Sequence, residues 1–340
     1  MGPEGGEGMS GSTIPYHLRQ NKAVERNLFI ELLARVGRVK NISEYEYIGF
    51  GGPFMEDHKA LHAALRMGRM HSIEREKNTF LRQKFNYPAK FIQLHCKESS
   101  EFFRTHNFSD KGTVVWLDYT TADDLNEQLN EFHSVVAKLD TFDVAKITLN
   151  ASTIGLGQFN EVPEIEKAAK RRETLLARIP NFAPTDLTDK DFQTKKYPNT
   201  LQRCVQNSLR DLSARNTELY FHPLSTFSYA DGQPMLTITG MVFKASGDEE
   251  VDKFIADSRL DQWPFSNLDW APPMPINMPA LSAKERMRLD ELLPLDEHLA
   301  ENAAEHLKTQ LGFTPGATDG ELLNYAKYYR QYPHFSRVII

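Results

Sequence analysis

The stretch YIGFGGPFMEDH, Tyr47–His58, joins an apolar run to three glycines, a proline and two adjacent acidic residues. An apolar run that breaks into glycines before a helix is typical of the turn after the first strand of a nucleotide-binding α/β domain. Glycine lets the backbone approach a ligand closely there, because it has no Cβ. The stretch therefore raises the question of which ligand this turn accepts.

Strand-like and helix-like segments alternate around this turn. The expected strands are EYEYIGF, MHSIE, KFIQLH, TVVWLDY and FDVAKITLN, each followed by a helical or polar segment. Two further β-rich runs flank Asp231-Gly232, which is a hairpin signal. We therefore expect an α/β fold, with a doubly wound, mostly parallel seven-stranded sheet that ends in an antiparallel hairpin.

Segment composition divides the chain into five parts. Apolar residues at helical spacing (Val24, Leu28, Leu32, Val36) predict a helix from about residue 16 to 37. The expected parts are a disordered leader (1–12), an amino-terminal helix (13–42), the α/β domain (43–150 and 218–247), a helical insertion (151–217), and a proline-rich connector with a helical carboxyl-terminal extension (248–340).

Composition excludes several classes of protein. The 340 residues are 40% hydrophobic and 25% charged, which is ordinary for a globular protein. No apolar run approaches the roughly 20 residues that span a bilayer, and the first residues lack the apolar core of a secretory signal. Cys96 and Cys204 are the two cysteines, which fits a reducing compartment, so we expect a cytoplasmic protein without a membrane partner.

Basic residues are concentrated in two segments, although the net charge is −6. Residues 167–215 hold eleven basic and five acidic side chains, and residues 19–40 hold six and two. Such segregation suggests a nucleic acid or another polyanion as partner, bound by the amino-terminal helix and 167–215. The alternative is that both segments are ordinary solvated helix faces.

The order of elements resembles the class I S-adenosylmethionine-dependent methyltransferases over about residues 43–150 and 218–245. The resemblance implies that Gly49, Gly51 and Gly52 wrap the methionine part of S-adenosylmethionine. The family usually has an acid two positions before the first glycine and a further glycine after the third, where this chain has Tyr47 and Pro53.

Two acids after the turn bear on the choice of cofactor. Glu56 and Asp57 fall in the first helical turn, where a dinucleotide would place its pyrophosphate. Acidic side chains would repel that group but tolerate the cationic S-adenosylmethionine. Alternatively, both acids only complement the helix dipole.

Further cofactor contacts follow from the resemblance. Glu74 ends the second expected strand, where an acid binds both ribose hydroxyls. After the third strand, Cys96, Lys97 and Glu98 are candidates to lie beside the adenine. The alternatives are a surface acid at Glu74 and a helix cap near Ser99.

The fourth strand ends in Asp118-Tyr119, where amine methyltransferases of this superfamily carry Asp/Asn-Pro-Pro-Tyr. The resemblance implies that Asp118 contacts the methyl acceptor and Tyr119 shapes its pocket. Thr120 and Thr121 replace the prolines, so Asp118 is alternatively a general base for a hydroxyl, or a helix cap.

The RNA ribose 2′-O-methyltransferases offer a second comparison through their Lys-Asp-Lys-Glu set. Lys22, Asp118 and Lys146 are at similar places, and a lysine of lowered pKa would act as base. The last expected strand, PMLTITGMVF, provides no glutamate.

We predict no metal site from the sequence. His58 and His62 are four residues apart on one helix, but no third ligand follows at a motif spacing. The predicted function is transfer of a methyl group from S-adenosylmethionine to an oxygen or nitrogen. The alternative is a non-catalytic sensor or partner-binding subunit that binds the cofactor or a nucleotide.

Overall fold

The computed structural model describes residues 19–210, 212, 219–244, 248–296, 299 and 302–333. The expected leader and the start of the amino-terminal helix lie outside these ranges. Within them, no helix has both the length and the apolar character needed to cross a bilayer.

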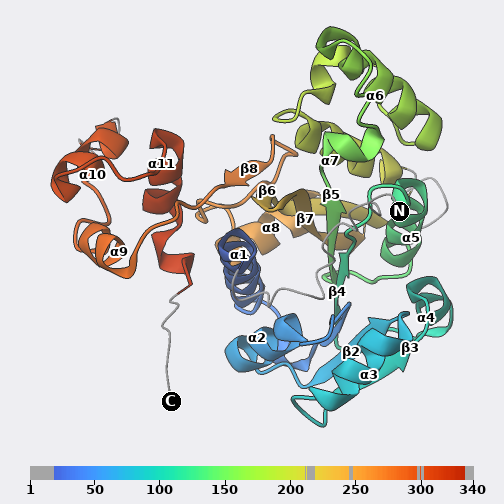
Figure 1. Ribbon diagram of the computed structural model, residues 1–340. Coiled ribbons are helices and arrows are strands. Elements are labelled where there is room, and N and C mark those ends of the chain that lie inside the picture. The colour runs from blue at the N-terminus through green and yellow to red at the C-terminus, as the bar shows by residue number, and fades with distance from the viewer. Residues whose placement is uncertain are drawn as a thin grey trace.

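One twisted sheet organises the molecule (Figure 1), with the strand order β3-β2-β1-β4-β5-β7-β6-β8. The first five strands are parallel, and β7 runs antiparallel to both β5 and β6. The predicted α/β fold and its terminal hairpin are confirmed. The strands are β1 (Glu46–Gly49), β2 (Arg69–Glu74), β3 (Ile92–Cys96), β4 (Thr113–Asp118), β5 (Val144–Asn150), β6 (Leu219–Asp231), β7 (Gln233–Lys244) and β8 (Met274–Ile276).

The strand β8 is one more than the sequence predicted. It comes from the proline-rich connector and pairs in parallel with β6, for example Phe227 with Met274. Proline cannot donate to the ladder, so it is tolerated in sheets chiefly at edges. Pro275 sits in the middle of this short edge strand and hides it from periodicity arguments.

Helices cover both faces of the sheet. Helices α1, α2 and α8 pack on the face that carries Trp116, and α4, α5 and α7 pack on the face that carries Val115. The helices are α1 (Gln20–Val36), α2 (Glu56–Leu65), α3 (Lys77–Phe85), α4 (Ser99–Thr105), α5 (Leu125–Val136), α6 (Glu164–Arg178), α7 (Tyr197–Ser208), α8 (Asp248–Ser258), α9 (Ala283–Asp290), α10 (Ala303–Leu311) and α11 (Asp319–Tyr328).

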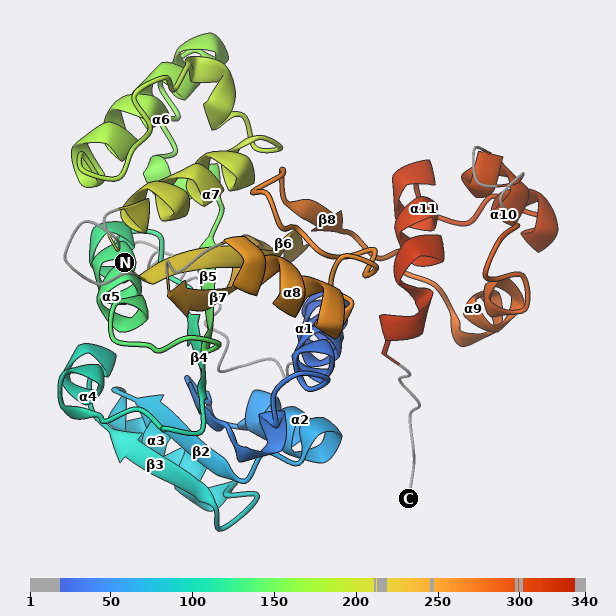
Figure 2. The same cartoon turned by 180° about the vertical axis from the view of Figure 1, so that it is seen from behind.

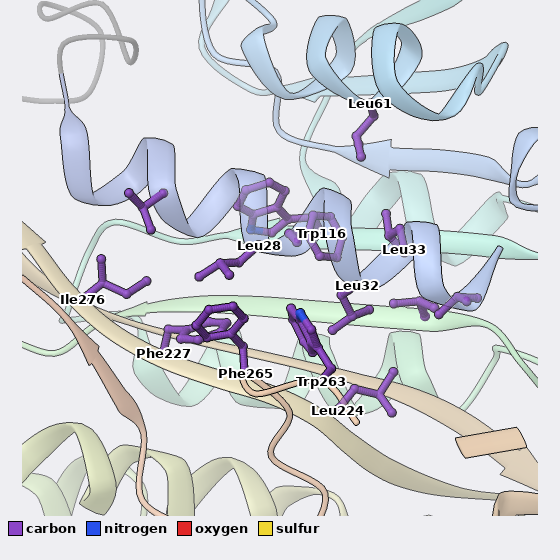
Figure 3. Packing of buried hydrophobic residues seen from close by; sticks show 14 of the residues in the cluster. Leu28, Leu32, Leu33, Leu61, Trp116, Leu224, Phe227, Trp263, Phe265 and Ile276 are labelled. Atoms are coloured by element: carbon purple, nitrogen blue, oxygen red, sulfur yellow. The ribbon is translucent and has the colours of Figure 1, made fainter. Parts of the chain in front are cut away.

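The predicted stripe on the amino-terminal helix is the centre of one core. Leu28 and Leu32 of α1 are completely buried, and Figure 3 shows them between Leu61 of α2 and aromatic side chains that include Trp263. The indole Nε1 of Trp263 donates to Glu31 of α1 at 3.0 Å. The connector is thereby held against α1.

Two helical parts flank the sheet. Helix α6 of the insertion lies beyond α7, away from the sheet, and α9 to α11 form a separate lobe on another side (Figures 1 and 2).

Candidate functional site

Four strand ends that carry predicted site residues meet at one edge of the sheet. Because β3, β2, β1 and β4 are neighbours and parallel, their carboxyl ends share this edge. Strand order reverses between β1 and β4, and such switch points are where open α/β sheets bind ligands. We call this the carboxyl edge.

The glycine turn after β1 is tightly packed. A Cβ on Gly51 would lie 2.3 Å from the Ser72 hydroxyl, and a Cβ on Gly49 would lie 2.5 Å from the Tyr47 hydroxyl. Gly52 has a φ of +51°, which favours glycine. The backbone can take this path only because these positions lack side chains.

Polar side chains beside the turn fit a polar ligand. Gln83 of α3 donates to the Gly52 carbonyl at 2.9 Å. Among the described residues, its Oε1 and the Ser72 hydroxyl are buried without a hydrogen-bond partner. Buried polar atoms usually have partners, so these two oxygens suit a ligand that donates hydrogen bonds.

Glu74 and Glu98 differ in their surroundings. Glu74 is half-buried at the end of β2, burial raises its pKa, and one carboxylate oxygen accepts from the Glu76 amide at 2.8 Å. Glu98 precedes α4 and forms an exposed ion pair with Arg75 at 3.7 Å. Glu74 is therefore the better placed of the two to hold a ribose.

The acids after the turn are both paired within the protein. Asp57 is buried and accepts from Arg26 Nε at 2.5 Å. Burial raises the pKa of Asp57, but Arg26 and Lys22 outweigh burial and keep it below its usual value. Glu56 pairs with Lys59. The negative charges of Glu56 and Asp57 are thus largely compensated. They would therefore repel a pyrophosphate less than the sequence predicts.

Lys22 and Asp118 form a buried ion pair at the carboxyl edge. Lys22 Nζ lies 2.6 Å from Asp118 Oδ2, and both side chains are less than a tenth exposed. The hairpin fixes Lys22, because Asp231 accepts from the backbone amides of Asn21 and Lys22 at 3.2 and 2.8 Å. These amides belong to the helix terminus, where N–H groups lack intrahelical partners.

Lys146 forms a second pair with a residue that the sequence argument missed. Its Nζ lies 2.5 Å from Glu25 Oε1, and neither side chain is exposed by more than 1%. Thr237 of β7 also donates to Glu25, at 3.1 Å. Burial lowers the pKa of Lys146, and Glu25 opposes this effect.

Trp116 lies against both lysines. Its ring centroid is 3.6 Å from Lys146 Nζ and 5.9 Å from Lys22 Nζ, distances at which a cation is attracted to the ring face. The Lys-Asp-Lys set of the sequence comparison is therefore brought together. A glutamate, Glu25 of α1, lies three residues after Lys22 and pairs with Lys146, and the last strand provides none.

Two buried oxygens beside the Lys22–Asp118 pair have no hydrogen-bond partner among the described residues. They are Asp118 Oδ1 and the hydroxyl of Tyr229. Burial raises the pKa of Tyr229 well above its usual value, so this hydroxyl stays protonated. The pair and these two oxygens offer an acceptor, a donor and a fixed positive charge for a polar substrate group.

Tyr119 lies apart from this arrangement. Its hydroxyl donates to Glu131 of α5 at 2.5 Å, and its ring packs edge-on against Phe50 at 5.6 Å. Since α5 covers the face opposite to α1, the structure does not bring Tyr119 to the Lys22–Asp118 pair.

His58 and His62 each bond to a backbone carbonyl. Their partners are the carbonyls of His71 and Met67, at 3.1 and 2.8 Å. Both histidines therefore have local bonding roles on α2.

Comparison with known proteins identifies a family. The model of a family described as "Putative O-methyltransferase" matches residues 14–340, nearly the whole chain. A comparison with curated proteins finds no match.

Two solved structures illustrate the similarity of fold. The plantazolicin methyltransferase BamL, solved with a triazolic desmethylPZN analog and SAH, is 12% identical, with 73% of this chain and 78% of that chain covered and a TM-score of 0.40. Trm1 from Pyrococcus horikoshii, solved with S-adenosyl-L-methionine, is 8% identical, with 68% and 57% covered and a TM-score of 0.43. At these scores the likenesses carry no argument about substrate or mechanism.

The match to the family model confirms the resemblance found in the sequence. The cofactor that the sequence resemblance implies is S-adenosylmethionine. The chain belongs to the family described as "Putative O-methyltransferase".

Proposed function

We propose that the protein transfers a methyl group from S-adenosylmethionine to a hydroxyl oxygen at the carboxyl edge. The observation that carries this proposal is Asp118, whose Oδ2 is held by Lys22 at 2.6 Å while its buried Oδ1 has no partner among the described residues. An acceptor hydroxyl would donate to Oδ1. The family description favours oxygen over nitrogen as the acceptor atom.

Each residue of the proposed site has a distinct task. The bound cofactor supplies a methyl group activated by its sulfonium. Asp118 orients the acceptor and takes its proton as the O–C bond forms and the S–C bond breaks, and such base catalysis typically contributes about 10²–10⁴-fold. Lys22 holds Asp118 in position. Glu74, with Gly49, Gly51 and Gly52, would hold the cofactor.

Lys146 has a supporting task in this proposal. It was a catalytic candidate in the sequence, but its ammonium is fully buried between Glu25 and Trp116. An ammonium that is held in an ion pair carries no lone pair with which to take a proton from an acceptor. We therefore assign Lys146 the task of holding Glu25 and α1 in place.

The insertion is proposed to select the acceptor, and nucleic acid is one class to test. Three of its arginines pair with acids: Arg172 with Asp189, Arg178 with Asp123, and Arg203 with Asp186. This pairing lowers the positive charge that a polyanion would meet. RNA binding that weakens steeply with salt would support the nucleic-acid class.

A second candidate function follows from the low solvent exposure of the Lys22–Asp118 ion pair. Asp118 and Lys22 are nearly buried, whereas a cavity of about 490 Å³ lies between α4 and α5. This favours the non-catalytic reading, in which the fold binds the cofactor as a sensor or partner-binding subunit.

A methyl-transfer assay separates the two candidates. Wild-type protein is incubated with methyl-labelled S-adenosylmethionine and a panel of hydroxyl acceptors, including RNA. We expect labelled product from wild type and from Asp124→Asn, an exposed neighbour on the same loop, and a loss of about 10²–10⁴-fold in Asp118→Asn. Equal rates in Asp118→Asn would overturn the assignment, and cofactor binding without any transfer would favour the sensor.

A further inference from the structure

The amino edge of the sheet, opposite to the carboxyl edge, carries a second cluster of titratable side chains. Glu46 begins β1, His71 lies in β2, and His106 directly follows α4. Glu46 is only 2% exposed, and the two histidines are buried or half-buried. The three residues are far apart in the chain, and the proposed methyl transfer does not use them.

Both imidazoles approach the same carboxylate oxygen. The Nε2 atoms of His71 and His106 lie 3.4 and 3.3 Å from Glu46 Oε2, and all three ligating atoms lie within 4.8 Å of one another. Charge-assisted N–H···O bonds are shorter, about 2.7–2.9 Å. Zn²⁺ lies about 2.0–2.2 Å from such atoms, so tetrahedral geometry separates two ligands by roughly 3.4 Å. The spacing fits ligands around an ion.

The carboxylate is held so that Oε2 faces the imidazoles. Its other oxygen, Oε1, accepts from the Ser109 amide at 2.6 Å and the Thr113 hydroxyl at 3.2 Å. Nε2 of His106 lies at the same distance, 3.3 Å, from Oε1 as from Oε2.

A third histidine, His95, lies beside His71. His71 Nδ1 lies 3.0 Å from His95 Nε2. If His95 accepts from the Nδ1–H of His71, the lone pair on His71 Nε2 is free. Metal-bound histidines commonly donate their other N–H to a partner in this way.

We propose that Glu46, His71 and His106 bind one divalent transition-metal ion, for which zinc is the best fit, and that His95 positions His71. Two imidazoles and a carboxylate suit this borderline ion, and solvent would complete the tetrahedron. The ion would tie β1 to β2 and to the segment after α4. Its role is structural, because these residues lie at the edge opposite to the glycine turn.

Metal titration tests this proposal without any acceptor. Chelator-treated protein is titrated with Zn²⁺ by calorimetry and with Co²⁺ by visible absorption. We expect one ion per chain, the absorption bands of tetrahedral Co²⁺, and a higher Tm with zinc. His95→Ala should lower the affinity for zinc by roughly 10–100-fold, as is typical when a residue that hydrogen-bonds to a metal ligand is removed. His106→Ala and Glu46→Gln should lower this affinity further.

Two controls keep the result interpretable. His306→Ala removes a histidine from α10 and should bind zinc like wild type. His106 is half-buried, so His106→Gln is expected to fold, which circular dichroism checks. Zinc binding equal in wild type, His106→Gln and Glu46→Gln, or binding without fixed stoichiometry, would overturn the site. Binding of S-adenosylmethionine should persist in His106→Gln, so this failure is distinguishable from failure of the proposed function.

Discussion

At the carboxyl edge each buried acid is paired with one base, whereas at the amino edge two imidazoles converge on one carboxylate. Among the described residues, Lys22 holds a single oxygen of Asp118, and the other, buried oxygen has no partner. In Glu46 one oxygen accepts from the Ser109 amide and the Thr113 hydroxyl and lies 3.3 Å from His106, and the other lies near both His71 and His106. The first arrangement suits a substrate that donates a hydrogen bond, and the second suits a cation.

The largest expected effect is on stability and lies beneath the carboxyl edge. Lys146→Met leaves the Glu25 carboxylate buried without its cation, which should cost about 3–5 kcal/mol of folding free energy. Chemical denaturation measures this. The double variant Glu25→Gln/Lys146→Met should recover part of the loss, and Lys59→Met, at an exposed pair, should change little. A denaturation midpoint of Lys146→Met equal to that of wild type would contradict the stabilising role of the Lys146–Glu25 pair.

The next effect is on catalysis. Lys22→Met removes a charged hydrogen bond worth about 1.5–3 kcal/mol, so the rate of methyl transfer should fall by roughly 10–150-fold. Because Lys22 pairs with Asp118, which is assigned to the acceptor, the affinity for S-adenosylmethionine should stay near that of wild type. A loss confined to cofactor affinity would mean that the pair serves the cofactor instead of the acceptor.

The folding stability should depend on pH through Asp143, a buried acid at the amino edge. Burial raises the pKa of Asp143 from 3.8 to about 7, against hydrogen bonds from the Asp140 and Thr113 amides. The folded state then binds a proton that the unfolded state has lost, so this group's contribution to stability falls as pH rises from about 4 to 7. Chemical denaturation between pH 5 and 8 should show that Asp143→Asn loses less stability than wild type as pH rises. An equal dependence of stability on pH in both proteins would contradict the raised pKa of Asp143.

The smallest effect should come from Glu98→Ala. Its carboxylate is exposed and pairs with Arg75 at 3.7 Å, and such surface pairs contribute little. Affinity for S-adenosylmethionine, measured by calorimetry, should change less than threefold. A loss as large as that in Glu74→Ala would restore Glu98 as a cofactor ligand.

The fold followed from local patterns, whereas the site depended on contacts that span the chain. Alternating segments and Asp231-Gly232 predicted the parallel sheet and the hairpin, because strands and turns are encoded locally. Glu25 was missed because the comparison placed a glutamate in the last strand, although it lies three positions after Lys22 on one helix face.

The amino edge could not be predicted at all. Glu46, His71 and His106 have no motif spacing, and only the pairing of β1 with β2 and the return of the chain after α4 bring them together. The burial of Lys22 and Arg26 could not be predicted either, because a count of basic residues does not show which side chains of α1 face the sheet. These two bases are ion-paired inside the protein, which weakens the predicted polyanion surface on that helix.

Calorimetric titration with S-adenosylmethionine tests the central claim, that the carboxyl edge is the cofactor site, most directly. Protein freed of any bound cofactor is titrated as wild type and as Glu74→Ala, with NAD as the competing ligand class. The account predicts one site selective for S-adenosylmethionine and at least tenfold weaker binding in Glu74→Ala, as expected for loss of about 1.5–3 kcal/mol of charged hydrogen bonding. Absent binding in wild type, or equal binding in Glu74→Ala, would contradict it.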